Sequence, residues 1–465
     1  MLKVNLKKIT IKDLSEIIKA QVLCPPPKNE VFSGVSTDSR NIKTGDCFFA
    51  ITGENFDGHD FVGNALAKGA VCALVEKDID CDNLEYKCIL KVRDTVQALG
   101  DLAAAYRKEA GYKIVAITGS VGKTTTREMI YHVLSRHFEV HQSPKSFNNK
   151  IGLPLTLLGA GQSVEIVIAE LGSNRPGEIG YLAEIAAPDI AVVTNVHPAH
   201  LEGFGDLHTI AREKLSISEG LVPDGVFIIN GDFKQLVSFC MDRNIAFKSF
   251  GKTDSLDYRA ENIRFQGSSS KFTVEGAEVE LPLPGAGNIE NALAAFAVCR
   301  QFDLTAADFA EAARTFSGAS MRAEVQQVGT LTVLNDCYNA NPASMENALD
   351  ILAGMDSTEK RRLVFICGDM AELGRQAEIL HIELGRYIAE ARIGFVISVG
   401  EFAKTAAETA QASAGYDLKI KCFDDTVSAC NNLHEIIKDY DIILVKGSRT
   451  GKLELVIEKL KEIFS

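Results

Sequence analysis

The stretch VAITGSVGKTTTREMI, residues 115–130, constrains the fold of this chain more than any other part of its sequence. An apolar, β-branched run gives way to a loop with two glycines, and a lysine and three threonines follow. This order is typical of a buried strand, a loop whose backbone N–H groups surround a phosphate, and a helix whose N-terminus favours the anion. The stretch therefore predicts an α/β domain that binds a nucleotide.

Each part of the loop has a predicted contact. Glycines allow the backbone to approach phosphate oxygens, a lysine meets the β- and γ-phosphates, and hydroxyls serve the metal. The predicted nucleotide-binding residues are Gly119, Ser120, Val121, Gly122, Lys123, Thr124 and Thr125. The longer GxxxxGK[ST] form is not met, because Ile117 stands where its first glycine would be. The alternative is an ordinary strand–turn–helix with an exposed lysine.

Short apolar runs alternate with helical stretches through three segments of the chain. Runs without polar alternation are typical of parallel strands that helices cover on both faces. The runs are GDCFFAI and AVCALVE in residues 1–112, YKIVAIT, VEIVIAEL, DIAVVTNV and GVFIIN in residues 113–317, and LTVLND, RRLVFICGD, GFVISVG and DIILVKGS in residues 318–465. Because 465 residues exceed one hydrophobic core, we predict three α/β domains with these boundaries.

Charge and hydropathy exclude two classes of function. The net charge of −13 leaves no basic excess to neutralise a nucleic-acid backbone. The N-terminus has no apolar core of a signal peptide, and no apolar run is long enough to span a bilayer. The eleven cysteines lack CxxC spacing and are predicted to be buried, reduced thiols. We expect a cytoplasmic protein that neither binds nucleic acid nor inserts into a membrane.

Polar residues at other strand ends are further candidates, because ligands of parallel sheets bind beyond the carboxyl ends of the strands. Glu170 ends VEIVIAE, where a carboxylate can hold Mg²⁺; a solvated glutamate is the alternative. His200 follows the strand DIAVVTNV, and His197 is the weaker of the two histidines; a lone histidine is often structural.

Two helical stretches carry the remaining candidates. Asn288 and Asn291, in LPGAGNIENALAAFAV, are spaced to lie on one helix face, where paired carboxamides can read an adenine edge. Helix capping is the alternative. Lys214 lies on a predicted helix in IAREKLSISEGL, and by itself indicates only a solvated lysine.

These motifs resemble those of the Mur ligases, ATP-dependent amide-forming enzymes of peptidoglycan synthesis. GVSTDSRNIKTGDCFFAITGENFDGHDF is similar to the family's UDP-binding domain, and TGSVGKTT, SFNNKIGLPLTLL, AELGSNRPGEI and NVHPAHLEGFG are similar to its central ATP-binding domain with a parallel sheet. NDCYNANPASMENAL, GDMAELG and VKGSR look like the Rossmann-like C-terminal domain of the member that joins D-alanyl-D-alanine to UDP-N-acetylmuramoyl-tripeptide. YNANP is the most discriminating stretch, because sister enzymes differ there.

The resemblance implies roles for individual residues. The catalytic set would be Lys123, Glu170, His200, Lys214 and Arg322, and the metal ligands would be Thr124, Glu170, His200 and Lys214. Lys214 matches a lysine that family members carry as a carbamate, which a neutral amine forms with CO₂. Asn288 and Asn291 would approach the adenine, Arg322 would reach the γ-phosphate, and Asp336 would lie near the nucleotide.

Substrate contacts are also implied by the resemblance. They would be made by Ser36, Thr37, Asp38, Ser39 and Arg40 for the uridine diphosphate, and by Asn148, Asn149, Tyr338, Asn339 and Asn341. Asp57, Gly58 and His59 are a further match, for which a glycine turn with a capping aspartate is the alternative. One departure is visible: Gly287 stands where many relatives have a histidine before the first adenine asparagine.

The implied reaction uses ATP and Mg²⁺ to convert the tripeptide carboxylate into an acyl phosphate, which the dipeptide amine attacks. The C-terminal domain would close about a hinge near Gly318 to Arg322, and the resemblance suggests a monomer. Rival interpretations are another Mur ligase or folate polyglutamate synthase, a P-loop kinase that phosphorylates a stable acceptor, and a nucleotide-binding switch protein. The identity of the third residue in the tripeptide, lysine or diaminopimelate, is left open.

Overall fold

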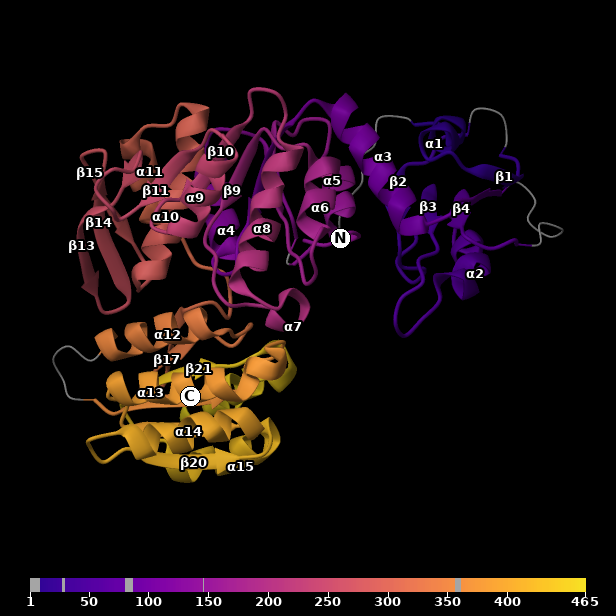
Figure 1. The fold of residues 1–465 in the computed structure, drawn as a ribbon. Helices are drawn as coiled ribbons and strands as arrows, with labels where there is room; N and C mark the ends of the chain where they lie inside the picture. The colour runs from indigo at the N-terminus through magenta and orange to yellow at the C-terminus, as the bar shows by residue number, and fades with distance from the viewer. Residues whose placement is uncertain (1–8, 27–29, 80–86, 145, 356–360) are drawn as a thin grey trace.

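Three large sheets, one in each segment of the chain, organise the computed structural model (Figure 1). The structure describes residues 9–26, 30–79, 87–144, 146–355 and 361–465. The N-terminal domain lies to one side, and the long helix α3 (Thr95–Ala110) leads from it to the central domain. The C-terminal domain lies against the central one, with α12 (Pro342–Met355) at the boundary. The predicted three-domain α/β fold is confirmed.

The N-terminal domain contains a five-stranded sheet in the order β1-β5-β4-β3-β2. Only β1 is antiparallel to its neighbour. The strands are β1 (Gln21–Cys24), β2 (Gly34–Ser36), β3 (Asp46–Phe49), β4 (Cys72–Val75) and β5 (Cys88–Lys91). The helices are α1 (Ile11–Ile17), η1 (Gly58–Phe61) and α2 (Val62–Ala67). All residues of β3 and β4 are buried, as their unbroken apolar runs predict.

The central domain has a parallel seven-stranded sheet in the order β12-β11-β10-β9-β6-β8-β7. Its strands are β6 (Lys113–Thr118), β7 (Val140–Gln142), β8 (Ile166–Glu170), β9 (Ile190–Val193), β10 (Val226–Asn230), β11 (Lys248–Gly251) and β12 (Tyr258–Arg259). Its helices are α4 (Lys123–Leu134), α5 (Gly152–Gly159), α6 (Glu178–Ala186), α7 (Leu201–Phe204), α8 (Leu207–Leu215), η2 (Ser216–Gly220) and α9 (Lys234–Asp242). The chain order reverses at β6, which places a crevice at its carboxyl end, the usual ligand position in such sheets.

An antiparallel meander follows, which the sequence interpretation missed. It consists of β13 (Glu261–Gln266), β14 (Ser269–Val274) and β15 (Ala277–Leu281). Along β14, buried side chains alternate with partly exposed ones, so one face of the meander is buried. The helices α10 (Ala286–Cys299), η3 (Arg300–Phe302) and α11 (Ala306–Ala313) come next. Phe272 and Leu281 of the meander share a core with Phe296 and Phe309 of these helices. That core fixes the start of α10 beside the crevice.

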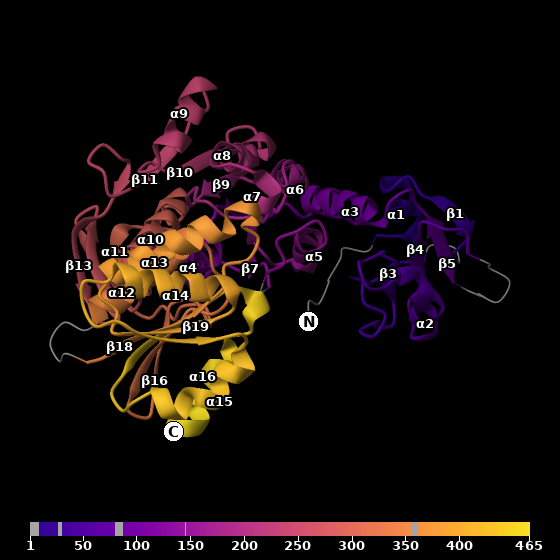
Figure 2. The same cartoon turned by 60° about the horizontal axis from the view of Figure 1, so that its bottom comes forward.

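The C-terminal domain has a mixed six-stranded sheet in the order β16-β17-β21-β18-β19-β20, in which only β16 is antiparallel. The strands are β16 (Glu324–Val328), β17 (Leu331–Asn335), β18 (Leu363–Gly368), β19 (Phe395–Val399), β20 (Lys419–Phe423) and β21 (Ile442–Lys446). The other helices are η4 (Gly374–Gln376), α13 (Ala377–Glu390), α14 (Glu401–Ser413), α15 (Thr426–Ile436), η5 (Arg449–Gly451) and α16 (Glu454–Phe464). Figure 2 shows α12, α13 and α14 on one side of this sheet and α15 and α16 on the other. The predicted parallel strands are confirmed.

The cysteines differ from the sequence prediction at one place. Nine are free, and seven of these nine are buried. Cys24, however, is disulfide-bonded, so the expectation that every thiol is reduced is wrong there. Spacing along the chain cannot show which thiols a fold brings together. No helix in the described ranges is long and apolar enough to cross a membrane.

Candidate functional site between the central and C-terminal domains

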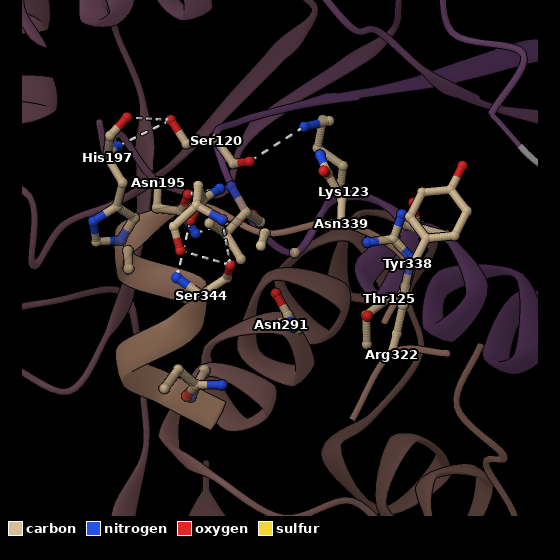
Figure 3. A pocket seen from close by; sticks show the side chains of 18 of the residues that line it. Ser120, Lys123, Thr125, Asn195, His197, Asn291, Arg322, Tyr338, Asn339 and Ser344 are labelled. Atoms are coloured by element: carbon tan, nitrogen blue, oxygen red, sulfur yellow. Dashed lines mark hydrogen bonds between the residues drawn. The ribbon is translucent and has the colours of Figure 1, made fainter. Parts of the chain in front are cut away.

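A cavity of about 630 Å³ lies where strand ends of the central and C-terminal sheets face each other. The central domain contributes the loop after β6, and the C-terminal domain contributes residues that follow β17 and end β21. Figure 3 shows side chains from both domains around the same space. Residues that lie far apart in the sequence therefore form one site.

The loop between β6 and α4 has the backbone that a phosphate loop requires. Gly119 and Gly122 have positive φ angles of 148° and 85°. A Cβ on Gly122 would lie 2.1 Å from Asn291 Oδ1, so this position has neither the conformation nor the space for a side chain. The backbone N–H of Val121 donates to Asn195 Oδ1 at 2.8 Å, which anchors the loop to the end of β9.

Lys123 begins α4 and its ammonium is folded back onto the loop. Its Nζ donates to the carbonyl of Gly119 at 2.7 Å. Burial lowers the pKa of Lys123; Glu170 opposes this shift and Arg322 reinforces it. The Lys123 side chain thus lies inside the cavity, where a positive charge on it would interact strongly with an anionic ligand.

Glu170 ends β8 and is only 2% exposed. Thr124 Oγ1 donates to its Oε2 at 2.9 Å, and Asn148 Nδ2 donates to its Oε1 at 2.9 Å. The guanidinium of Arg127, on α4, lies 3.4 Å from Oε2. The structure therefore brings together three predicted residues, and adds the buried Arg127, which the sequence interpretation missed. The only feature of the sequence that could have indicated Arg127 is its position, as a charged residue, on the apolar face of a helix.

Lys214 is buried on α8 and reaches the cavity wall through Ser173. Its Nζ donates to Ser173 Oγ at 2.8 Å. Burial, followed by the charge of Lys123, lowers the pKa of Lys214 to about 7, while Glu213 and Glu178 act in the opposite direction. Glu213 also accepts the backbone N–H groups that start α6, and so fixes the segment that follows Ser173.

The two histidines both line the cavity. His200 lies in the left-handed region, with φ 53°, and its Nδ1 contacts the carboxylate of Glu372 from the C-terminal domain. Burial lowers the pKa of His200, and Glu372 opposes this shift. Burial lowers the pKa of His197 to about 4, and its ring lies edge-on to Phe233 at 5.0 Å. The backbone of Glu202 donates to Glu372 as well, so this contact joins the two domains.

Arg322 lies in the connection between the two domains, and its guanidinium stacks over the ring of Tyr338 at 4.2 Å (Figure 3). Asp336 follows β17, and its carboxylate accepts from the backbone N–H of Ala323 and from the buried Lys446. Asn339 lies beside Tyr338 at the cavity. Lys446 was not predicted as a site residue, although it belongs to the VKGSR motif.

The adenine candidates Asn288 and Asn291 lie on one face of α10 and line the cavity. Asn288 Nδ2 donates to the carbonyl of Pro284, and Asn291 Oδ1 accepts from Thr126 Oγ1. Asn347 of α12, which was not predicted, accepts from the backbone N–H of Gly287 at 3.2 Å. A Cβ on Gly287 would lie 3.0 Å from Asn347 Oδ1, so Asn347 occupies the space beside the glycine.

Two other predicted asparagines cap helices at the cavity rim. Asn149 Oδ1 accepts from the backbone N–H groups of Ile151 and Gly152, at the start of α5. Asn341 Oδ1 accepts from the backbone N–H of Ser344, in the first turn of α12. Both residues line the cavity while they stabilise the helices that border it.

The predicted uridine-diphosphate residues lie apart from this cavity, in the N-terminal domain, at the end of β2 and in the loop that follows it. They are Ser36, Thr37, Asp38, Ser39 and Arg40. Arg40 makes two hydrogen bonds to Asp38 at 2.9 Å, and they lower the pKa of Asp38 to about 2.

The segment around Asp57 forms the glycine turn with a capping aspartate that was the alternative interpretation of this motif. Asp57 caps η1 through the backbone N–H of His59 and also contacts the His59 ring at 2.6 Å. A Cβ on Gly58 would lie 2.6 Å from the backbone of Ile51, so the turn requires glycine.

The loop after β6 faces a second α/β domain across a polar cavity. This arrangement defines the class: a multidomain α/β protein with a P-loop at the boundary between two domains. Three family models match the chain: Mur ligase family, catalytic domain, over residues 31–107; Mur ligase middle domain over 117–299; and Mur ligase, glutamate ligase domain, over 321–449.

Full-length relatives agree with these models. The chain is 34% identical over 458 residues to the UDP-N-acetylmuramoyl-tripeptide–D-alanyl-D-alanine ligase of Bacillus subtilis, which covers 98% of this chain and 99% of that protein. A crystal structure of MurF from Acinetobacter baumannii superposes with a TM-score of 0.89 at 32% identity and covers 98% and 99% of the two chains. The Thermotoga maritima MurF ligase in complex with ADP has a TM-score of 0.81 at 27% identity, covering 92% and 97%. The chain belongs to the Mur ligase family.

Proposed function

We propose that this protein joins D-alanyl-D-alanine to UDP-N-acetylmuramoyl-tripeptide at the expense of ATP, giving the pentapeptide precursor of peptidoglycan, ADP and phosphate. The observation that carries this proposal is that the phosphate loop and the YNANP segment line the same cavity. ATP bound to this loop would lie opposite the segment that distinguishes the dipeptide-adding member of the family, which supports the proposal. The full-length similarity to relatives of that name supports the same reaction.

A carboxylate is a poor acyl donor because its oxygen is a poor leaving group, so it must be activated before an amine can attack it. One carboxylate oxygen of the tripeptide attacks the γ-phosphorus of ATP, and ADP leaves. The amine of D-alanyl-D-alanine then attacks the acyl phosphate, loses a proton, and expels phosphate with the oxygen that came from the carboxylate. Lys123 and Arg322 supply positive charge for the phosphoryl oxygens during transfer. Closure of the C-terminal domain over the cavity would exclude water, which would hydrolyse the acyl phosphate.

The donor set fits Mg²⁺. Thr124 Oγ1 and Glu170 Oε2 are oxygens 2.9 Å apart, and Mg²⁺ in nucleotide sites is held by one or two protein groups with phosphates and waters. No three His, Cys, Asp or Glu side chains of the described residues could hold a metal by themselves, so phosphate oxygens would complete the site. Thr124, Glu170, His200 and a modified Lys214 would hold the ion, which supplies charge neutralisation when bound.

Lys214 is suited to carbamylation. Carbamate formation needs an uncharged amine, and burial with the nearby Lys123 favours that form at neutral pH. The carbamate would exchange a cation for an anion beside Ser173. This change would make Lys214 a ligand rather than a repulsive charge.

The N-terminal domain, residues 1–112, is proposed to hold the uridine diphosphate through Ser36 to Arg40, with residues 113–317 binding ATP and residues 318–465 binding the dipeptide. Arg40 would exchange part of its contact with Asp38 for the pyrophosphate. Asn148 and Asn149 would serve the tripeptide, and Tyr338, Asn339 and Asn341 the dipeptide. We further propose that the protein acts as a monomer in the cytoplasm.

The test is phosphate release from ATP in the presence of UDP-N-acetylmuramoyl-tripeptide, with D-alanyl-D-alanine or single amino acids added in turn. Release stimulated by the dipeptide, with a new amide detected by mass, is expected. Stimulation by a single amino acid would assign a sister reaction instead. A phosphorylated acceptor without an amide would favour a kinase, and nucleotide binding without turnover would favour a switch protein.

A further inference from the structure

Lys446 is a charged residue that the proposed reaction does not use, yet it is buried at the cavity. It ends β21 and is 2% exposed. Its Nζ donates to Asp336 Oδ2 at 2.5 Å, to the carbonyl of Asn339 at 3.1 Å, and to the carbonyl of Asp336 at 3.5 Å. An ammonium has three N–H donors, and three acceptors surround this one. Lys446 therefore has no donor left over for a substrate.

The partners of Lys446 belong to the segment that follows β17. Asp336 uses its second carboxylate oxygen, Oδ1, to accept from the backbone N–H of Ala323 at 3.0 Å. The backbone N–H of Tyr338 donates to the carbonyl of Met321 at 3.2 Å. These two hydrogen bonds tie the connection between the domains to the YNANP segment.

The connection is held in an unfavourable backbone conformation around Arg322. Met321 and Ala323 have φ angles of 61° and 48°, in the left-handed region that residues with a Cβ rarely adopt. Such a conformation persists only where surrounding contacts impose it. The hydrogen bond from Ala323 to Asp336 is such a contact, and Lys446 holds the carboxylate that accepts it.

Arg322 lies between these two residues, and its guanidinium stacks on Tyr338. The contacts form one continuous path from Lys446 through Asp336 and Ala323 to Arg322, with Asn339 and Tyr338 on the other branch. We infer that Lys446 is a positioning residue that aims Arg322 and the YNANP segment at the reacting groups. This inference rests on the proposed function, because it assumes that Arg322 acts in the phosphoryl transfer.

A second ion pair in the same sheet, with a buried carboxylate and a partly exposed arginine, offers a control. Arg362 Nη2 lies 2.5 Å from Asp441 Oδ2, and the carboxylate side chain of Asp441 is 2% exposed. Asp441 immediately precedes β21, so this pair lies at the opposite end of the strand that Lys446 ends. Arg362→Met removes a cation from a buried carboxylate without touching the cavity path. It reports the effect of lost stability alone.

The experiment compares Lys446→Met with Arg362→Met in the amide-forming assay, with kcat expressed per ADP-binding site measured by calorimetry. Counting sites in this way removes unfolded protein from the comparison. We expect Lys446→Met to lower kcat by about 100-fold, the size of effect that misplacing a catalytic group produces. Its KM for ATP should change by less than about threefold, because Arg322 acts on the transition state. Arg362→Met should keep the kcat of the wild type.

The path itself is tested by a double-mutant cycle with Arg322→Ala. If Lys446 acts through Arg322, adding Lys446→Met to Arg322→Ala lowers kcat little further, by less than about threefold. Losses that multiply in full would overturn the inference, as would an unchanged kcat in Lys446→Met. If Lys446→Met fails to fold, Lys446→Gln is measured in the same cycle. Its amide keeps one donor for Asp336, so its loss of kcat should be smaller than about 100-fold and should still disappear in the Arg322→Ala background; a loss that persists there would overturn the inference. A wild-type protein that forms no amide would instead refute the proposed function.

Discussion

Lys214 provides a quantitative prediction, because its predicted role requires an uncharged amine. Its pKa is lowered from the ordinary value of 10.5 to about 7 in the folded protein, mainly by burial. In the unfolded chain the amine keeps its ordinary pKa. Between these two values the unfolded state binds one more proton than the folded state, so the free energy of unfolding rises with pH in this window. The slope is about 1.4 kcal/mol per pH unit.

The perturbation is Lys214→Met, which removes the titrating group and keeps most of the apolar side chain. From about pH 7 to about pH 9.5 the wild type should gain about 3 kcal/mol over the variant, because folded Lys214 is half protonated at the lower pH and nearly neutral at the upper. Other groups titrate in both proteins, so the difference isolates Lys214.

The assay is urea unfolding of both proteins in buffers freed of CO₂, across this pH range. A parallel sample in ¹³C-bicarbonate should show a carbamate resonance in the wild type that the variant lacks. A stability difference that does not change with pH would mean that Lys214 keeps an ordinary pKa in the fold. That result would refute the reasoning for carbamylation.

Three further predictions concern the cavity and the contact between domains. Lys123→Ala should keep the fold, judged by its circular dichroism, and lose at least about 100-fold in ATP turnover, since a preorganised charge is removed; near-normal turnover would contradict the phosphate-loop assignment. Gly122→Ala should weaken ADP binding at least about tenfold in calorimetry, because φ is 85° and the added Cβ would lie 2.1 Å from Asn291 Oδ1; unchanged affinity would contradict the loop geometry. In a Glu202→Cys/Gly374→Cys double variant the two Cβ atoms would lie about 3.5 Å apart, so oxidation should cross-link the domains. The cross-link should lower turnover at least about tenfold, and reductant should restore it. Full turnover of the oxidised protein would exclude a required domain motion.

Sequence alone predicted the groups whose position follows from strand order. Glu170 and the loop from Gly119 to Thr125 follow neighbouring parallel strands, so their meeting at one sheet edge could be expected. Arg322 was expected at the nucleotide only through the family resemblance. The structure brings Arg322 to the cavity, where its charge contributes to the lowered pKa of Lys123.

Residues that depend on contacts between distant segments could not be found in this way. Arg127, Glu372 and Lys446 each look like an ordinary charged residue in the sequence, and only packing shows that they hold Glu170, His200 and Asp336. For the same reason, the spacing of cysteines along the sequence did not predict the disulfide at Cys24.

Some polar residues that line the cavity also have a structural role as helix caps. Asn149 and Asn341 line the cavity and also cap helices, so capping and substrate binding are not alternatives at these positions. At Gly287, where many relatives have a histidine, Asn347 of the C-terminal domain fills the space beside the glycine. The contact links the start of α10 to the position of that domain.

The central claim is that ATP activates a carboxylate. The most direct test uses UDP-N-acetylmuramoyl-tripeptide carrying ¹⁸O in both oxygens of the carboxylate that forms the new amide, with D-alanyl-D-alanine and ATP. The account predicts that each phosphate released with the amide contains one ¹⁸O atom, because the carboxylate oxygen leaves with the phosphoryl group. Amide formation accompanied by unlabelled phosphate would contradict an acyl-phosphate intermediate and the role assigned to this cavity.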